Sequence, residues 1–525
     1  METRQFFGTD GIRGPVGGPI ICGHFFRRLG CGIGEFLQRI SLPGPVAIGG
    51  DGRTSGKELR DAFVSGLPSE VEVLNLGILG TPAIAVATGF LGGAVGIALT
   101  ASHNPATDNG IKFFDSNGRK WSSEWESLLE ELLAAEKVCP EQTVTNVRNS
   151  HAAALFTYKE WWLRHFSPGA LEGLGVVLDM ANGATASYGA AFLESLGAAV
   201  IPMGNCPDGQ NINGGCGSQW PEALAERVRA EGVPWGLAVD GDGDRALLCD
   251  STGTVLAGEH LLARLAHLQF SKYPLVRPLL ITTVQANGVL ERHLPFEVLR
   301  TPVGDRSVAG AMARSDCLLG GEPSGHVLLP DWDVEGRGRG PAQRFCTADG
   351  LLAGALFLST FLGENNRQLS ANWNFPLNPT AVRSVAVVEK FPLEKALHFQ
   401  AKKKQVAAAL GENGRLLVRY SGTENRLRFL VEATDVAVAE QFVEELTGAF
   451  TLDMAHLSGE KGSVEKIKVG GAALEQARRT MEVEAAAIRA TAERLTEDFT
   501  ATVELLLNHR GKIILCGVGK SGFIA

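Results

Sequence analysis

Several motifs that define common protein classes do not occur in this 525-residue sequence. It contains no C-x-x-C pair, and its nine cysteines are an odd number at irregular positions. This argues against a disulfide framework or a zinc knuckle and favours reduced thiols in a cytoplasm. It also contains no block of basic residues, and its 49 Lys and Arg are outnumbered by 58 Asp and Glu, for a net charge of -9. We therefore expect no nucleic-acid partner, because such proteins carry a basic patch.

No leader or membrane anchor is predicted either. The first five residues are partly charged and no apolar run follows them, so we expect no signal peptide. Residues 73–107 contain no Asp, Glu, Lys or Arg, but Pro82 and several glycines interrupt them, whereas a membrane span needs about 20 predominantly apolar residues. This stretch predicts a short buried helix followed by a buried strand, with a membrane span as the weaker alternative. We expect a cytoplasmic protein with no membrane partner.

The composition is that of a large globular protein. The chain is 45% hydrophobic and 20% charged, and its 64 glycines are well above the usual share of about 7%. A typical domain size of about 150 residues predicts three or four domains. The many glycines indicate tight turns at which the backbone approaches another group closely.

Up to about residue 370, short apolar runs end in glycine-rich polar loops and alternate with helical patterns. Four such runs occupy residues 45–48, 95–99, 175–178 and 236–239. Continuous apolar runs between helices are typical of strands buried on both faces, so this region is predicted to be α/β with largely parallel sheets. Ligands of such sheets bind beyond the carboxyl ends of the strands, where these loops lie.

The pattern changes after about residue 375. Strands are predicted at residues 382–388 and 415–418, and an amphipathic helix is predicted at residues 436–450. These elements indicate a smaller α+β domain.

The first of four chemically informative loops is TASHNP at residues 100–105. Ser102 follows a buried strand, next to His103 and a turn-forming Asn-Pro pair, which is where a nucleophile would be exposed. A helix-capping serine followed by a turn is the simpler interpretation of this loop alone. No G-x-S-x-G elbow occurs, which disfavours an α/β-hydrolase.

The second loop is DGDGDR at residues 240–245. Its alternating carboxylates, Asp240, Asp242 and Asp244, can converge on a hard divalent cation. An EF-hand is excluded, because Arg245 stands where that motif needs Gly and Ser251 stands where it needs Glu. Three carboxylates leave coordination positions open, which suits Mg²⁺ shared with a phosphate oxygen. A solvated acidic turn is the alternative.

Two further loops carry polar groups suited to a phosphorylated sugar. In GEPSGH at residues 321–326, Glu322 and Ser324 can bind vicinal hydroxyls and His326 can move a proton, although a plain surface turn is an equal alternative. In RYSGTENRLR at residues 419–428, hydroxyls, a glycine amide and up to three guanidiniums form a compact phosphate cradle, with a solvated charged turn as the alternative. The simplest chemistry that uses all four loops is phosphoryl transfer on a phosphorylated polyol, with a seryl covalent carrier.

These four loops, in this order, resemble the motifs of the α-D-phosphohexomutase superfamily over residues 6 to about 451. FGTDGIRG at residues 7–14, DNGIK at 108–112 and VGDR at 303–306 further resemble the bacterial phosphoglucosamine mutase branch. The resemblance implies three α/β domains with mixed sheets, a smaller α+β fourth domain and an incomplete α/β piece. The implied parts are residues 1–150 with the phosphoserine loop, 151–255 with the metal loop, 256–370 with the sugar loop, 371–455 with the phosphate loop, 456–472 as a linker and 473–525 as the incomplete piece.

The resemblance also implies an activity. Glucosamine 6-phosphate and glucosamine 1-phosphate would be interconverted through a phosphoserine, with glucosamine 1,6-bisphosphate as intermediate and activator, on the route to UDP-N-acetylglucosamine and peptidoglycan. A phosphoglucomutase or phosphomannomutase is the first alternative, because Pro323 stands where the superfamily usually has Gln, Met or Ser and the connection over residues 327–346 is long. A non-catalytic phosphosugar-binding or assembly protein is the second.

The resemblance assigns roles to residues of the four loops. Ser102 would carry the phosphate, with His103 beside it, and Mg²⁺ would be held by the seryl phosphate and by Asp240, Asp242 and Asp244. Around the transferring group would lie Arg13, Lys112 and Arg245, with Lys112 and His326 as acid and base candidates. Sugar hydroxyls would be held by Glu322 and Ser324. The non-reacting phosphate would be gripped by Arg419, Ser421, Gly422, Thr423 and Arg428.

Residues 474–525 resemble the opening of a sugar isomerase (SIS) domain of the arabinose-5-phosphate isomerase type, with a helix from Leu474 and a strand at residues 512–516 before GVGKSG. The last run is no P-loop, because Ile514 stands where that motif needs its first glycine. Only one helix and one strand are present, so no isomerase activity is expected. Such a piece cannot bury its apolar face alone. We expect it to dock on the rest of the chain, to pair with a second copy as a homodimer, or to be poorly ordered.

Overall fold

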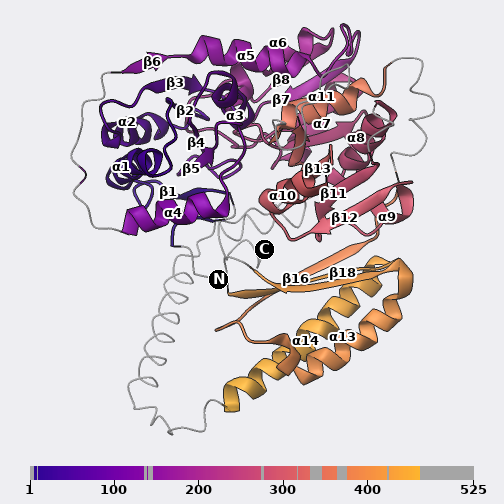
Figure 1. Cartoon of the computed structure of the whole chain (residues 1–525). Helices are drawn as coiled ribbons and strands as arrows, with labels where there is room; N and C mark the ends of the chain where they lie inside the picture. The colour runs from indigo at the N-terminus through magenta and orange to yellow at the C-terminus, as the bar shows by residue number, and fades with distance from the viewer. Residues whose placement is uncertain are drawn as a thin grey trace, which may run out of the picture. The chain divides into compact units, whose positions relative to one another are not determined.

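The computed structural model describes residues 5–8, 10–134, 139, 146–272, 277–315, 317–330, 346–362, 375–421 and 425–460. The chain divides into two compact units, Met1–Pro392 with Ala401–Thr447, and Leu393–Gln400 with Gly448–Ala525. Gly422, Thr423 and the predicted isomerase-like piece at residues 473–525 lie outside the described residues. Figure 1 shows the order of the described helices and strands along the chain.

The first sheet has six strands in the order β1-β5-β4-β2-β3-β6. The pairs that join β4, β2, β3 and β6 are parallel, whereas β5 runs antiparallel to β4 and β1. Its strands are β1 Ile12–Pro15, β2 Val46–Gly50, β3 Val73–Ile78, β4 Val95–Leu99, β5 Asp108–Phe114 and β6 Val147–Asn149. Its helices are α1 Gly23–Arg39, α2 Gly56–Gly66, α3 Thr81–Phe90 and α4 Ser123–Ala134, with α1 and α2 packed side by side (Figure 1).

The charge-free stretch at residues 73–107 contains more than was predicted. The expected buried helix and strand are confirmed as α3 and β4, in which residues 81–88 and 95–99 are buried. The strand β3 was missed, because its apolar residues join those of α3 in one run that carries no charge to mark the boundary.

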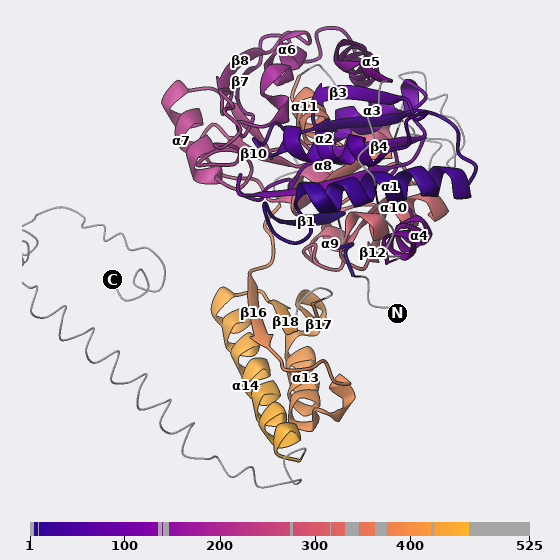
Figure 2. The ribbon, with the colours of Figure 1, turned by 90° about the vertical axis from the view of Figure 1, so that its left-hand side faces the viewer.

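The second sheet has four strands in the order β10-β9-β7-β8, parallel except for the β10-β9 pair. Its elements are α5 His151–Leu163, β7 Gly175–Asp179, η1 Ala184–Ser187, α6 Gly189–Glu194, β8 Ala199–Met203, α7 Pro221–Glu231, β9 Trp235–Val239 and β10 Ala246–Asp250. Helix α7 lies beside β10 (Figure 2). It also contacts β9, and its Leu224 and Val228 pack in one cluster with Val177, Ala238 and Cys249. Strand β9 is buried along its whole length, as its continuous apolar run predicts.

The third sheet has five strands in the order β12-β11-β13-β14-β15 and also mixes parallel and antiparallel pairs. Its elements are α8 Gly258–Lys272, β11 Leu279–Thr283, α9 Leu290–His293, β12 Glu297–Thr301, α10 Asp305–Ser315, β13 Gly320–Gly321, β14 Val327–Pro330, β15 Cys346–Ala348 and α11 Gly350–Ser359. The mixed sheets implied by the resemblance are therefore confirmed in all three α/β parts.

The fourth sheet has three antiparallel strands in the order β16-β18-β17. Its region contains β16 Thr380–Ala386, η3 Leu393–Lys395, α13 Leu397–Leu410, η4 Gly411–Asn413, β17 Arg415–Tyr420, β18 Arg426–Glu432 and α14 Val436–Glu460. The predicted α+β character is confirmed. Helix α14 continues past residue 450, so residues 456–460, predicted as the start of a linker, are helical. Within the second compact unit, Asp453 accepts hydrogen bonds from the backbone N–H groups of His398 (3.2 Å) and Phe399 (2.8 Å).

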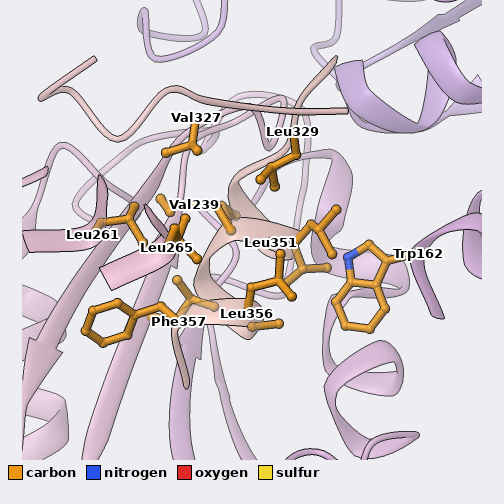
Figure 3. Packing of buried hydrophobic residues seen from close by; sticks show 14 of the residues in the cluster. Trp162, Val239, Leu261, Leu265, Val327, Leu329, Leu351, Leu356 and Phe357 are labelled. Carbon is orange, nitrogen blue, oxygen red and sulfur yellow. The ribbon is translucent and has the colours of Figure 1, made fainter. Parts of the chain in front are cut away.

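The largest core surrounds helix α11, which is apolar on all sides and buried over residues 350–358. Leu351, Leu356 and Phe357 of this helix lie among side chains from the second and third sheets and their helices, including Trp162, Val239, Leu261, Leu265, Val327 and Leu329 (Figure 3). Burial of each such side chain contributes about 1.5–3 kcal/mol. This packing fixes the ends of β9 and β14 with respect to each other. None of the helices in the described part of the chain combines the length and apolar character that a bilayer span requires.

Candidate active site

Ser102 stands just beyond the carboxyl end of β4, and its side chain is buried. Its backbone has a left-handed φ of 55°, which costs a non-glycine residue about 1–2 kcal/mol and persists only where the surroundings impose it. Its Oγ donates a 2.6 Å hydrogen bond to Oδ2 of Asp240. A turn and then β5 follow rather than a helix. The helix-capping interpretation of this serine is therefore wrong, whereas the turn is confirmed.

The aspartate loop lies between β9 and β10. The carboxylates of Asp240, Asp242 and Asp244 are buried and offer ligand oxygens within 4.8 Å of one another. Oδ1 of Asp240 accepts hydrogen bonds from the backbone N–H groups of Asp244 (3.1 Å) and Arg245 (3.2 Å), which fold the loop around this carboxylate. Gly243 has a φ of 76°, so a glycine between the aspartates permits the tight wrap.

These three carboxylates could hold a metal ion. Burial, and then repulsion from Asp244 and Asp242, raises the pKa of Asp240 well above its ordinary range. Among the described residues, none donates a hydrogen bond to the buried Oδ1 of Asp242. Carboxylate oxygens are preferred ligands of Mg²⁺. The residues present therefore fit such an ion.

Lys112 projects from β5 into the same cluster and is buried. Its Nζ lies 2.7 Å from Oδ2 of Asp242, 2.6 Å from Oδ2 of Asp244 and 3.3 Å from Oδ2 of Asp10. Although burial disfavours its charge, these three carboxylates raise the pKa of Lys112. It is therefore an ammonium group at neutral pH.

Arg13, Arg245 and His103 complete the surroundings of the serine. Arg13 lies on β1, which pairs with the strand that carries Lys112, and Nε of Arg245 lies 3.9 Å from Oδ1 of Asp244. The Oγ of Ser102 is 3.4 Å from Nδ1 of His103. Burial, and then the charges of Arg245 and Arg13, lowers the pKa of His103 to about 4, so its imidazole is neutral at neutral pH.

The sugar loop between β13 and β14 is attached to the aspartate loop by its backbone. Arg245 and His326 form an isolated antiparallel bridge, and the N–H of Ala246 donates to the carbonyl oxygen of Gly325 at 3.0 Å. Gly325 has a φ of 82°, and a Cβ at this position would lie 1.9 Å from the carbonyl oxygen of Ala246. Only glycine therefore allows this close approach.

The side chains of the sugar loop differ in exposure. Glu322 is half-buried and Ser324 is exposed, whereas His326 is buried. Nδ1 of His326 lies 3.6 Å from Oδ1 of Asp244, and Nε2 lies 3.3 Å from Oδ2 of Asp305. Although burial opposes it, these two carboxylates raise the pKa of His326 to about 9. The structure thus brings the first three predicted loops together around one group of carboxylates.

Three charged residues that sequence reasoning left without a role lie in this group. Nζ of Lys120 contacts the carboxylates of both Asp10 and Asp305, and Asp10 also contacts the guanidinium of Arg13. Asp10 and Asp305 belong to the motifs at residues 7–14 and 303–306. These motifs indicated only the family resemblance and gave neither aspartate a role. Lys120 belongs to no motif, so no local signal marked it.

The fourth predicted loop includes residues of β17 and β18, and its described part is residues 419–421 and 425–428. Arg419 and Arg428 are directly opposite each other in register. Burial, and then the charge of Arg428, lowers the pKa of Arg419. The carbonyl oxygen of Ser421 accepts a 2.7 Å hydrogen bond from Lys390, which sequence reasoning missed. Arg426, in contrast, is bound to Ser384 of β16.

A buried serine hydroxyl beside a carboxylate, oxygen ligands for a hard cation, and flanking Lys and Arg side chains are the components of a phosphoryl-transfer site. The arrangement is therefore suited to phosphoryl transfer.

Comparison with known proteins identifies the family. Models of the phosphoglucomutase/phosphomannomutase family match four consecutive regions: alpha/beta/alpha domain I at residues 4–138, domain II at 162–253, domain III at 257–374 and the C-terminal domain at 381–449. The chain belongs to this family. It is therefore a phosphohexomutase, an intramolecular phosphotransferase.

Individual relatives agree with this assignment. The chain is 38% identical over 454 residues to a phosphoglucosamine mutase of Cereibacter sphaeroides, with 85% of this chain and 99% of that protein covered. It is 36% identical over 469 residues to a phosphoglucosamine mutase of Leuconostoc citreum, with 86% and 99% covered. Among solved structures, a phosphoglucomutase/phosphomannomutase family protein of Burkholderia thailandensis superposes with a TM-score of 0.66 at 21% identity, over 85% of this chain and 97% of that one. This last similarity shows the fold alone.

Proposed function

We propose that the chain interconverts glucosamine 6-phosphate and glucosamine 1-phosphate through a phosphoserine at Ser102 and a glucosamine 1,6-bisphosphate intermediate. The observation that carries this proposal is the left-handed, buried Ser102, whose Oγ is held 2.6 Å from Asp240. The choice of glucosamine is supported by relatives named phosphoglucosamine mutase at 36–38% identity.

The reaction consists of two phosphoryl transfers that balance. In the first, the bond between phosphorus and Oγ of Ser102 breaks, a bond from phosphorus to the oxygen of the free sugar hydroxyl forms, that hydroxyl gives up its proton, and Oγ takes up a proton. In the second, the bond between the other phosphate of the reoriented bisphosphate and its sugar oxygen breaks, that phosphate returns to Oγ, Oγ gives up its proton, and the released sugar oxygen takes one up. Lys112 and His326 are the side chains we assign to these proton movements. Arg13 and Arg245, with His103 beside the serine, surround the transferring group.

Asp240, Asp242 and Asp244, together with the seryl phosphate, would hold Mg²⁺. When bound, this ion would offset the negative charge that the transferring phosphoryl group brings among the carboxylates. Lys112 adjoins Asp242 and Asp244, so its ammonium would contribute positive charge to the same group.

Substrate would be held by the two remaining loops. We assign Glu322 and Ser324 to sugar hydroxyls. The non-reacting phosphate is assigned to Arg419, Ser421, Gly422, Thr423 and Arg428. Each phosphate of the bisphosphate must be transferred in turn. The residues that bind the non-reacting phosphate must therefore accept the phosphate at either end of the sugar.

A substrate panel tests the proposal. The 6-phosphates of glucosamine, glucose and mannose are compared by kcat/KM, with Mg²⁺ and the matching 1,6-bisphosphate supplied. We expect glucosamine 6-phosphate to be preferred, and phosphate to be found on Ser102 by mass spectrometry. Ser102→Ala should carry no phosphate and show no turnover. Preference for glucose or mannose 6-phosphate would favour the phosphoglucomutase/phosphomannomutase alternative, and full activity of Ser102→Ala would contradict the mechanism.

We also propose a cytoplasmic location and a homodimer. Light scattering on the full chain and on a chain that ends at residue 472 tests the dimer. A mass that stays monomeric in both would contradict it.

A further inference from the structure

Ser102 is flanked by a buried cluster that the proposed chemistry does not use. It consists of Asp51, Arg53 and Thr100, which we call the serine clamp. Asp51 and Arg53 follow β2, and Thr100 follows β4. Because these strands are parallel neighbours, their carboxyl ends bring the three side chains together, where they are 2%, 2% and 1% exposed.

Arg53 uses all of its hydrogen-bond donors inside the protein. Its Nε donates to Oδ2 of Asp51 at 2.9 Å. Its Nη1 and Nη2 each donate to two backbone carbonyl oxygens of the loop that contains Ser102. The acceptors are Ser102 (2.9 Å), Asn104 (2.8 Å), Asp108 (2.9 Å) and Pro105. A guanidinium has five N–H donors, so the loop is wrapped around one fully satisfied side chain.

Thr100 holds the other side of the same serine. Its Oγ1 accepts the backbone N–H of Ser102 at 2.8 Å and donates to Oδ2 of Asp51 at 2.6 Å. The carbonyl oxygen of Ser102 receives, besides Arg53, the side-chain amide of Asn213 at 2.9 Å. The backbone N–H and the carbonyl oxygen of Ser102 are thus both held by hydrogen bonds. The residue between these bonds has a left-handed φ of 55°.

We propose that the serine clamp positions Ser102 for phosphoryl transfer by imposing this backbone conformation, which directs Oγ toward Asp240. This rests on the proposed function, because it takes Ser102 as the phosphoryl carrier. Arg53 and Thr100 are positioning residues, since their side chains bond to backbone groups and to Asp51. The clamp requires a planar guanidinium rather than a positive charge alone. A lysine offers three donors from one point and cannot satisfy the same acceptors.

The test compares Arg53→Lys, Arg53→Ala and Thr100→Val with the natural chain and with Arg39→Lys. Arg39 is half-exposed and ion-paired with Glu131 at 3.1 Å, so lysine should replace it without effect. For the clamp variants we expect kcat to fall about 100-fold, the loss typical of a small misplacement of a reacting group. KM should stay near its original value, because no substrate contact is removed. Added guanidinium should restore part of kcat in Arg53→Ala, whereas the same concentration of sodium ion should not.

A second readout is phosphoryl transfer from the 1,6-bisphosphate onto Ser102 in a single turnover, followed by intact-protein mass. It should slow in parallel with kcat. Circular dichroism reports whether each variant folds. If the Arg53 variants fail to fold, Thr100→Val decides, since it keeps the side-chain shape and removes only the hydroxyl. Original kcat in Arg53→Lys or in folded Thr100→Val, or a loss confined to KM, would overturn the clamp while leaving the mutase function intact. A natural chain that accepts no phosphate on Ser102 would overturn both.

Discussion

Thr81 is hydrogen-bonded twice to Asp242: its Oγ1 donates to Oδ2 of the carboxylate at 2.6 Å, and its backbone N–H donates to the carbonyl oxygen at 2.8 Å. Thr81→Val removes the first bond and keeps the shape of the side chain. We predict that this variant binds Mg²⁺ about 10-fold or more weakly, as is usual when the partner of a metal-ligating carboxylate is lost. Titration calorimetry of the metal measures the change without recourse to turnover.

Thr88→Val is the matched control for this measurement. Thr88 is equally buried in helix α3, but its Oγ1 donates to the carbonyl oxygen of Ile84 at 2.8 Å. Metal affinity should be unchanged in this variant. Equal weakening in both variants would indicate a general disturbance of α3 and contradict a specific role for Thr81.

Asp349 predicts a pH dependence of stability. Its Oδ1 accepts the N–H of Leu352 at 2.9 Å as the N-cap of α11, and its Oδ2 accepts the hydroxyl of Tyr158 at 2.8 Å. Burial outweighs these bonds and raises the pKa of Asp349 from 3.8 to about 7. The folded chain therefore binds this proton more tightly than the unfolded chain. The stabilisation is complete below about pH 4 and is lost as the pH rises through about 7, by about 1.4 kcal/mol per pH unit.

Asp349→Asn removes this titration and keeps a good cap. From about pH 5 to about pH 8, the melting temperature of the natural chain should fall relative to that of the variant. Asp61→Asn serves as the control. Although burial opposes it, hydrogen bonds from Lys57 and Arg60 lower the pKa of Asp61, so it stays ionised over this range. Parallel pH profiles for the natural chain and Asp349→Asn would contradict the prediction.

The backbone junction at Gly325 should not tolerate a methyl group. Gly325→Ala would combine a left-handed φ of 82° with a Cβ that lies 1.9 Å from the carbonyl oxygen of Ala246. Gly411→Ala shares the strain, with a φ of 57°, but its Cβ would meet nothing within 4 Å. We predict a loss of about 1–2 kcal/mol from the backbone in Gly411→Ala and a clearly larger loss in Gly325→Ala. Denaturant unfolding measures the free energy of unfolding of both variants. Equal losses would contradict the prediction, because they would show that the backbone at Gly325 moves to accommodate the added Cβ.

Substitutions of Arg428 and Arg426 should affect KM differently, although the two residues are only two positions apart in the sequence. Arg428 lies opposite Arg419 in register and belongs to the phosphate site that we propose, and Arg426, which we do not assign to that site, donates hydrogen bonds to Ser384. A lost charge-assisted hydrogen bond costs about 1.5–3 kcal/mol, so Arg428→Met should raise KM roughly 10- to 150-fold. Arg426→Met should leave KM close to its original value. Steady-state kinetics decide, and a reversed order would place the phosphate elsewhere.

The residues that could be found from the sequence are those whose chemistry is local. Ser102 and the three aspartates stand in loops that come directly after apolar runs, and the rule that ligands gather at strand ends places them in one region. Thr81 could not be found in this way, because it stands 161 positions before Asp242 and within a run that carries no charge. Only folding brings Thr81 next to Asp242.

The same limit applies to the charged residues around the site. Lys120 joins Asp10 and Asp305 across 110 and 185 positions of sequence. Arg53 stands in a loop recognisable as a strand end, yet its main partners are backbone carbonyl oxygens, which a sequence does not display. Strand β3 was hidden for another reason, since apolar residues of a strand and of an adjoining buried helix read as one segment.

The bridge between Arg245 and His326 separates two properties of the enzyme. The sugar loop is fastened to the aspartate loop through main-chain hydrogen bonds and a glycine contact, and such bonds do not depend on which side chains the loop carries. Pro323 and Ser324 can therefore be exchanged for other residues while His326 keeps its distance from Asp244. The tip of this loop, which we propose contacts the sugar, can therefore change its side chains while the main-chain junction with the aspartate loop stays in place.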